Sequence, residues 1–370
     1  MARRILFLLH GVGQRAPDDA TDKLAAVATG WSKGTVDLLG KLTKKYDSKS
    51  DVSLKPGPDG VRIVPLSYGE IILRELMSWD DFGSKDVAKA FDKRFPQMGP
   101  GRIGQLQGIS RTDAPLFWTG AVDVLFYRLF FDRDIRAHLR EQIAQALVSE
   151  GAGALPPCSF ICHSLGTSVL HDTLAELLVA PEQFGGFANM DIQLYASISN
   201  VSKVLQSVAN PHGSAVRPIG AAGDARVAAF VRQFLNVHHI ADPIAHIGMF
   251  RPSWDPAQAF YRDVQIDQPK FVDVHGLVHY LEHPQVHIPI LRAACGITID
   301  AATEKKALQD FAKVKGDPCP EALNVLLADA KKVNTAWDNR GDATGPVEFA
   351  VAMVDAFKAF ERARTACGAP

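Results

Sequence analysis

Short apolar segments alternate along the chain with longer stretches in which apolar residues recur at helical spacing. The short segments predict strands at residues 4–9, 61–66, 159–162, 192–198, 234–239 and 271–274. Apolar strands separated by helices are typical of a mainly parallel sheet with helices on both faces. The pattern therefore predicts an α/β fold.

Helices are expected on both sides of the strand at residues 159–162. The helix before it has one apolar face, formed by Ile135, Leu139, Ile143, Ala146 and Leu147. Asp132 or Asp134 would cap that helix at its N-terminus. The apolar face of the helix after the strand is formed by Val169, Leu170, Leu174, Leu177 and Leu178.

Two regions depart from this alternation. Residues from about 71 to 131 form a long, aromatic-rich connection, which predicts a helical insertion that serves either as a lid or as extra helices packed on the sheet. Residues 299–370 show helical patterns only. We expect one domain over residues 1–298 and a C-terminal helical extension over residues 299–370.

Charge and cysteine content narrow the function classes. Lys and Arg number 40, Asp and Glu number 41, and the formal net charge is −1. A protein that binds nucleic acid electrostatically would show a basic excess or cluster, so none is expected as a partner. The five cysteines are odd in number and form no C-x-x-C motif, which predicts reduced thiols in a cytoplasmic protein.

The N-terminal apolar run is too short to direct secretion. It covers Ile5–Leu9, whereas a signal peptide has about 7–15 apolar residues and a small-residue cleavage site. No stretch reaches the roughly 18 apolar residues of a membrane span. We expect neither a signal peptide nor a transmembrane segment. Signal-independent export and the oligomeric state stay open.

Ser164 is the candidate nucleophile. It follows the strand at residues 159–162 and precedes the helix that begins near Ser168, within Ser164-Leu165-Gly166-Thr167. A strand, a sharp turn carrying a serine, and a helix form the nucleophile elbow of α/β-hydrolases. Such a turn would lift Ser164 Oγ above the sheet edge and direct the amide of Leu165 toward a developing oxyanion.

An acid and a base follow Ser164 in the order that this fold uses, Ser, then Asp or Glu, then His. Asp242 comes just after the strand at residues 234–239, where an orienting carboxylate is expected. Asp273 is the alternative acid, although it would lie within the last expected strand. His275 and His279 follow that strand and are both candidate bases.

A metal site is not expected. His275, His279, His283 and His287 recur every four residues, as ligands on one helix face would. Gly276, Pro284 and Pro289 interrupt any such helix, and no H-E-x-x-H motif is present.

Four segments together resemble a known family. They are His10-Gly11-Val12-Gly13, Cys162-His163-Ser164-Leu165-Gly166, Ala241-Asp242-Pro243, and His279-Tyr280 with Pro284-Gln285-Val286. They look like bacterial α/β-hydrolases of the serine esterase/lipase type, and the resemblance covers residues 1 to about 295. One position departs from the family pattern, because the elbow usually begins with glycine and here begins with Cys162.

The resemblance implies an α/β-hydrolase fold and assigns roles. The loop at Gly11 and Val12 would supply oxyanion-hole amides together with Leu165, and His279 is placed much as the family places its base. His163 is expected to pack beside the site. The implied activity is hydrolysis of a small-molecule or lipid-like carboxylic ester by Ser164, His279 and Asp242 through an acyl-enzyme, without a metal or an organic cofactor. The alternatives are a thioesterase or acyltransferase with the same triad, and a non-catalytic binding module of this fold.

Overall fold

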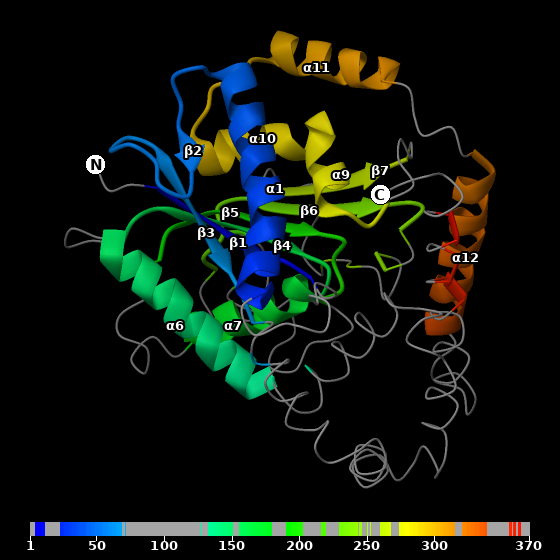
Figure 1. Cartoon of the computed structure of the whole chain (residues 1–370), viewed down its shortest axis with the longest axis horizontal. Coiled ribbons are helices and arrows are strands. Elements are labelled where there is room, and N and C mark those ends of the chain that lie inside the picture. The colour runs from blue at the N-terminus through cyan, green and yellow to red at the C-terminus, as the bar shows by residue number, and fades with distance from the viewer. Residues whose placement is uncertain are drawn as a thin grey trace, which may run out of the picture.

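A computed structural model of the chain contains one parallel sheet enclosed by helices (Figure 1). The structure describes residues 4–11, 23–68, 132–150, 155–179, 190–202, 216–219, 229–242, 244–245, 260–267, 274–314 and 320–338. It also describes residues 71, 127, 250, 252, 355–356, 358–359 and 362–363. No helix among these residues has both the length and the apolar character needed to cross a lipid bilayer.

The sheet has seven strands, and every neighbouring pair is parallel. In chain order they are β1 Arg4–Leu9, β2 Val52–Ser53, β3 Val61–Leu66, β4 Cys158–His163, β5 Ile192–Ile198, β6 Phe234–His239 and β7 Tyr261–Ile266. Their order across the sheet is β2-β3-β1-β4-β5-β6-β7. The chain therefore adds strands first on one side of β1 and then on the other.

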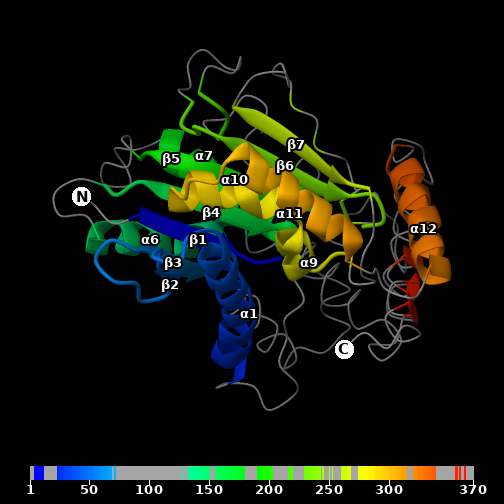
Figure 2. The same cartoon turned by 90° about the horizontal axis from the view of Figure 1, so that it is seen from above.

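The two faces of the sheet are covered by different helices. Helices α6 (Asp132–Glu150) and α7 (Leu165–Val179) pack on one face, and α1 (Lys23–Tyr46), α9 (Leu277–Glu282) and α10 (Pro284–Cys295) pack on the other (Figures 1 and 2). The alternation of side chains along β1 accounts for this. Ile5 and Phe7 join the core under α6 and α7, whereas Leu6 and Leu8 join the core under α1 and α10.

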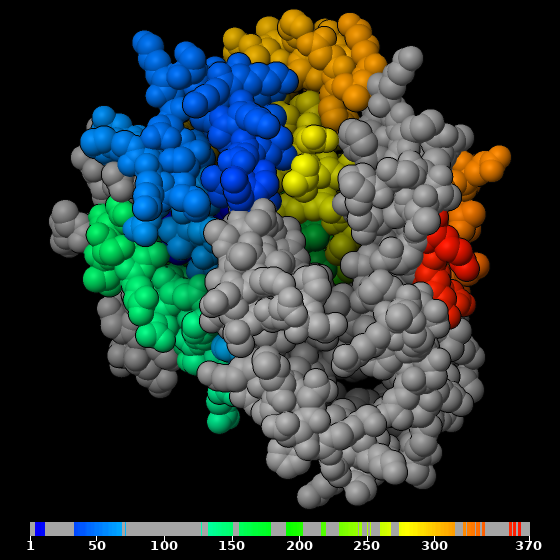
Figure 3. Space-filling model, viewed as in Figure 1, coloured from blue at the N-terminus to red at the C-terminus, as the bar shows by residue number. Residues whose placement is uncertain are grey.

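Helix α11 (Ala301–Lys313) adds a further layer outside α10 (Figure 2). Its N-cap is Asp300, whose carboxylate accepts a hydrogen bond from the Thr303 amide at 2.6 Å. Helix α10 begins with Pro284 and ends at Cys295; the residue that caps its C-terminus is Gly296, whose φ of 71° favours glycine. The space-filling view shows α1 beside α9, with α11 above them (Figure 3).

Helix α12 (Pro320–Asp338) packs on two loops at the end of the sheet. Leu326 of this helix is buried in an apolar cluster with Ala241 and Val274, which Ala359 and Ala363 complete. Ala241 and Val274 directly precede Asp242 and His275 in sequence. The C-terminal segments thus cover the backs of the loops that carry these two candidate site residues.

Most of the expected elements are present. The strands at residues 4–9, 61–66, 192–198 and 234–239 are confirmed with the same bounds, the strand at 159–162 is one residue longer at each end, and the helices before and after it are α6 and α7. Residues 271–273 lie outside the described part of the chain, as does nearly all of the expected insertion at 71–131. Val274 lies in a turn, and the strand that follows β6 is β7, which the apolar pattern missed.

We expect Leu326→Ala to lower the free energy of unfolding by about 2–5 kcal/mol, because it leaves a cavity in the cluster behind the two loops. Val325→Ala on the same helix is the matched control, since the Val325 side chain is exposed, and its effect should stay within about 0.5 kcal/mol. Urea unfolding monitored by circular dichroism measures both. Equal losses in the two variants would contradict the packing of α12 described above.

Candidate functional site

The candidate site lies at the carboxyl edge of the sheet. Gly11 follows β1, Ser164 follows β4 and Asp242 follows β6. The connections that leave β1 and β4 run to opposite faces, through α1 and α7 respectively (Figure 1). Neighbouring strand ends whose connections diverge in this way create a crevice, which is where open α/β sheets bind their ligands.

Ser164 has a strained backbone that its neighbours hold in place. Its φ is 54°, in the left-handed region, which costs a non-glycine residue about 1–3 kcal/mol. Its N–H donates to the Ile198 carbonyl at 3.0 Å, and its carbonyl accepts from the Thr167 amide at 2.9 Å and from Thr167 Oγ1 at 2.7 Å. The turn between β4 and α7 therefore fixes the direction of the Ser164 side chain.

Two glycines allow β1 and the turn at Ser164 to approach closely. A Cβ at Gly11 would lie 2.5 Å from Ser164 Cβ, and a Cβ at Gly166 would lie 2.4 Å from the His10 carbonyl oxygen. Cys162 stands where the elbow usually has glycine; it is buried, and its Sγ donates to the Ala196 carbonyl at 3.3 Å. The closest approaches of the backbone are therefore at Gly11 and Gly166, and the position of Cys162 accommodates a thiol.

Backbone amides are available beside Ser164. Leu165 is the first residue of α7, and the amides of a helix's first turn have no acceptor within the helix. The positive end of the helix dipole adds to their attraction for negative charge. Gly11 lies on the other side, where an added Cβ would be 3.1 Å from Ser164 Oγ. Val12, the third expected member of the oxyanion hole, lies outside the described residues.

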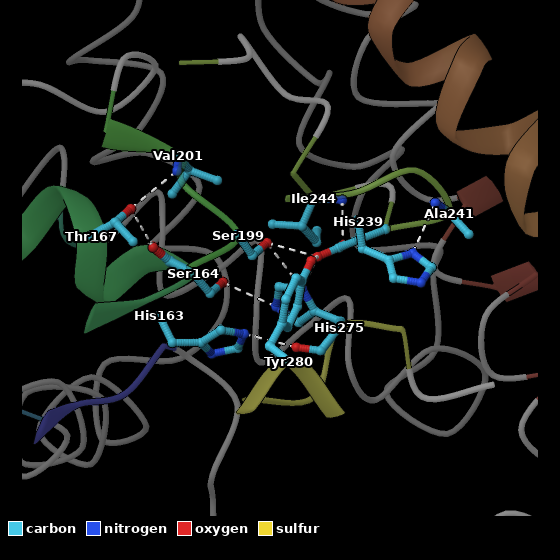
Figure 4. Close-up of polar contacts among 11 residues, drawn as sticks. His163, Ser164, Thr167, Ser199, Val201, His239, Ala241, Ile244, His275 and Tyr280 are labelled. Atoms are coloured by element: carbon cyan, nitrogen blue, oxygen red, sulfur yellow. Dashed lines mark hydrogen bonds and ion pairs between the residues drawn. The ribbon is translucent and has the colours of Figure 1, made fainter. Parts of the chain in front are cut away.

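Ser164, His275 and Asp242 form a continuous hydrogen-bonded chain. Figure 4 shows its first link, between Ser164 and His275. Ser164 Oγ is 3.1 Å from His275 Nε2, and His275 Nδ1 is 2.9 Å from Asp242 Oδ2. An ionised carboxylate only accepts hydrogen bonds, so Nδ1 of the neutral ring carries the proton. Nε2 then carries no proton, and its lone pair accepts a hydrogen bond from the Ser164 hydroxyl.

The Asp242 carboxylate is fully buried, and several hydrogen bonds offset the cost of burying its charge. Burial alone would raise its pKa, but the charge interaction and hydrogen bond with His275, together with hydrogen bonds from Tyr280 and Ser199, bring the pKa below its ordinary value. The Tyr280 hydroxyl and Ser199 Oγ each donate to Oδ2 at 2.7 Å, and the Ile244 amide donates to Oδ1 at 3.0 Å. Asp242 therefore stays ionised at neutral pH.

The preference for His279 over His275 as the partner of Ser164 is wrong in this geometry. His279 lies within α9, and its ring packs edge-on against His239 at 5.2 Å between centroids. Burial lowers the pKa of His279 to about 4, with a further contribution from His283. The turn at Val274 and His275 ends before α9 begins, and this turn directs the His275 ring toward Ser164 (Figure 4).

His163 supports the imidazole from the strand that carries the serine, in agreement with its expected packing role. Its Nε2 donates to the His275 carbonyl at 2.7 Å, and the two rings lie 4.7 Å apart. Burial and the neighbouring His275 lower the pKa of His163 to about 3, so it is neutral near pH 7. A neutral donor can hold the His275 backbone without adding a competing charge.

The side chains of Ser164 and His275 differ in exposure. Ser164 is 3% exposed, whereas a quarter of the His275 side chain is exposed. Electrostatic interactions are stronger in such a largely water-excluded setting than at an open surface. The site therefore combines a buried hydroxyl with a partly exposed imidazole.

Sequence reasoning missed Ser199 and Tyr280. Ser199 directly follows β5, so the strand-end argument that selected Asp242 would have pointed to it. Tyr280 is part of a segment that carries the family resemblance, but the sequence assigns it no role. Asp273, the alternative acid, lies outside the described residues, and no group of three or more potential metal ligands occurs within the described part of the chain.

Comparison with known proteins adds no relative. No protein-family model matches this chain, no curated protein matches it, and no solved structure matches it. What the site can do is therefore inferred from its own geometry.

We expect Gly166→Ala to lower the free energy of unfolding by about 1–3 kcal/mol, because the new methyl group would meet backbone oxygens that cannot move away. Gly34→Ala in α1 is the matched control. Its methyl group would have nothing within 4 Å, and replacing a glycine inside a helix should stabilise the chain by about 0.5–1 kcal/mol. Equilibrium unfolding of the two variants should give opposite signs; a common sign would contradict the close approach at the elbow.

The free energy of unfolding at acid pH should depend on the ionisation of Asp242. Because its pKa is lower in the folded chain than in the unfolded chain, its stabilisation is complete above about pH 4 and is lost as pH falls through the folded-state pKa. We expect the chain to lose stability relative to Asp242→Asn as pH falls below about 4. Urea unfolding at successive pH values measures this difference, and parallel curves for the two proteins would show that the carboxylate is not preferentially ionised in the fold.

Proposed function

We propose that this chain is a serine hydrolase of the α/β-hydrolase fold that cleaves carboxylic esters through an acyl-enzyme. The observation that carries the proposal is the chain of hydrogen bonds from Ser164 Oγ through the His275 ring to the buried Asp242 carboxylate. The order Ser, Asp, His along the sequence and the strained serine between a strand and a helix also agree with that fold.

The first half-reaction transfers the acyl group to the serine. His275 Nε2 takes the Ser164 hydroxyl proton as the oxygen attacks the ester carbonyl. The ring becomes an imidazolium, and the Asp242 carboxylate stabilises its charge and holds its orientation. His275 then gives the proton to the departing alkoxide, so the alcohol leaves as a neutral molecule and the acyl group stays on Ser164.

The second half-reaction restores the serine. Water loses a proton to His275 Nε2 and attacks the acyl carbonyl, and the proton returns to Ser164 Oγ as the carboxylic acid leaves. In both halves the carbonyl oxygen becomes negative. We assign its stabilisation to the Leu165 amide and to the backbone at Gly11, with Val12 as the further expected donor. The steps described here use only protein groups and water.

A thioester could react at the same three residues, and an alcohol could replace water as the acceptor. The aromatic-rich connection at residues 71–131 lies almost entirely outside the described residues. The ester assignment therefore rests on the catalytic groups rather than on a substrate pocket. Product analysis with water, alcohol and thiol acceptors distinguishes these activities.

Fluorophosphonate labelling tests the proposal, because this reagent reacts with a serine that a neighbouring base activates. We expect the folded chain to be labelled and Ser164→Ala to lose the label completely. His275→Ala should lower the rate of ester hydrolysis and of labelling by at least about 10³-fold, as loss of a triad base does. His279→Gln should keep the rate within about tenfold, since its ring faces His239.

Circular dichroism and unfolding curves serve as controls that each variant is folded. A folded chain without labelling at Ser164 would favour a non-catalytic module. If His279→Gln lost labelling while His275→Ala kept it, the assignment of the base would be wrong even though the serine was correct.

A further inference from the structure

Ser199 lies directly after β5, at the same edge of the sheet as Ser164 and Asp242, and the proposed mechanism does not use it. It is fully buried, and its φ is 50°. Its N–H donates to the Val237 carbonyl at 2.8 Å, which ties it to β6. Among the described residues, only Ser164 and Ser199 combine a side chain with a positive φ.

The Ser199 hydroxyl contacts both polar partners of the site. Its Oγ lies 2.7 Å from Asp242 Oδ2 and 3.3 Å from His275 Nδ1. Figure 4 shows the contact between Ser199 and His275. Because the carboxylate has no proton to give, the hydroxyl proton points at Asp242. The oxygen lone pairs of Ser199 are then available to the N–H of His275, which already donates to Asp242 Oδ2 at 2.9 Å.

This arrangement favours one tautomer of His275. The ring's Nδ1 faces two oxygens, both of which can accept its proton, so the tautomer with the proton on Nδ1 is stabilised. That tautomer leaves Nε2 free to take the proton of Ser164. The hydroxyl also draws charge from Oδ2, which limits how strongly Asp242 holds the imidazolium.

We propose that Ser199 is a positioning residue that fixes the orientation and the proton of His275 through Asp242; the inference rests on the proposed function. A glycine would adopt the backbone of Ser199 without strain. The serine adds only a Cβ and a hydroxyl, and the hydroxyl is the group that contacts Asp242. The role therefore belongs to the oxygen and not to the backbone of the turn.

The test compares Ser199→Ala with Ser199→Gly in the full chain. Both remove the hydroxyl, while glycine relieves the positive φ and provides a variant that folds readily. We expect the second-order rate of fluorophosphonate inactivation to fall about 10- to 100-fold in both, the loss expected for a hydrogen bond to a charged group. Inactivation near the wild-type rate in the folded Ser199→Gly variant would overturn the proposal.

The pH profile of inactivation separates positioning from a structural role. Loss of the donor leaves more charge on Asp242 Oδ2, so the apparent pKa of the acidic limb should rise in both variants. The other titratable groups that face this pair, His163 on β4, His239 on β6, and His279 and Tyr280 on α9, are the same in all three proteins. A slower reaction with an unchanged or lowered acidic limb would contradict the proposed role.

A measurement that needs no catalysis keeps the inference distinct from the proposed function. The imidazole ¹⁵N shifts of His275 report which nitrogen carries the proton. We expect the Nδ1-protonated form in the wild type and a loss of this preference in both variants. If wild-type Ser164 is not labelled but the shifts change as expected, the proposed function fails while the positioning role stands. Unchanged shifts would overturn the positioning role.

Discussion

The charge of a buried carboxylate has to be stabilised by hydrogen-bond donors, and the donors to Asp242 come from several segments at one end of the sheet. Burying an ionised group without partners costs more than most single interactions in a protein contribute. Asp242 Oδ2 accepts hydrogen bonds from Ser199 after β5, from His275 in the turn before α9, and from Tyr280 within α9. Segments far apart in sequence are held together by the need to satisfy one oxygen.

The sheet supplies the geometry that this oxygen needs. Ser164 and Ser199 follow adjacent strands, and each donates its N–H to a carbonyl of the next strand in the order β4-β5-β6. Each also has a positive φ, so the chain turns sharply as it leaves the sheet. The strain is local, whereas the hydrogen bonds that maintain it come from strands buried on both faces. A stable sheet thus orients two hydroxyls toward one imidazole.

The sequence allowed most of the sheet and two of the three linked residues to be predicted. Strands buried on both faces read as apolar runs, which is why β1, β5 and β6 were recognised with their bounds. Strand β7 was missed because it is an edge strand in which Arg262, Asp263 and Gln265 alternate irregularly with buried positions.

The preference for His279 as the partner of Ser164 was wrong for a related reason. Because β7 contains no apolar run, the sequence predicts the last strand at residues 271–274 and places His275 and His279 together in the loop after it. The structure separates them: His275 ends a turn, while His279 lies inside α9 and faces β6 through His239. His275 and His279 are only four positions apart, yet one side chain points to Ser164 and the other to His239. The periodicity of apolar residues does not indicate which way a side chain in a turn will point. Ser199 was missed because one serine after a strand has no pattern of its own.

The backbone of His275 is held by contacts from other elements, and these contacts tie His275 to Ser164. His163, the last residue of β4, donates to the His275 carbonyl, so the strand that presents Ser164 also fixes the backbone of its partner. Behind the site, Leu326 of α12 packs in one cluster with the neighbours of Asp242 and His275. A shift of the turn would break this partly buried hydrogen bond and also open the apolar cluster. The 3.1 Å contact between Ser164 and His275 is therefore a consequence of packing on several elements, and the short turn alone does not determine it.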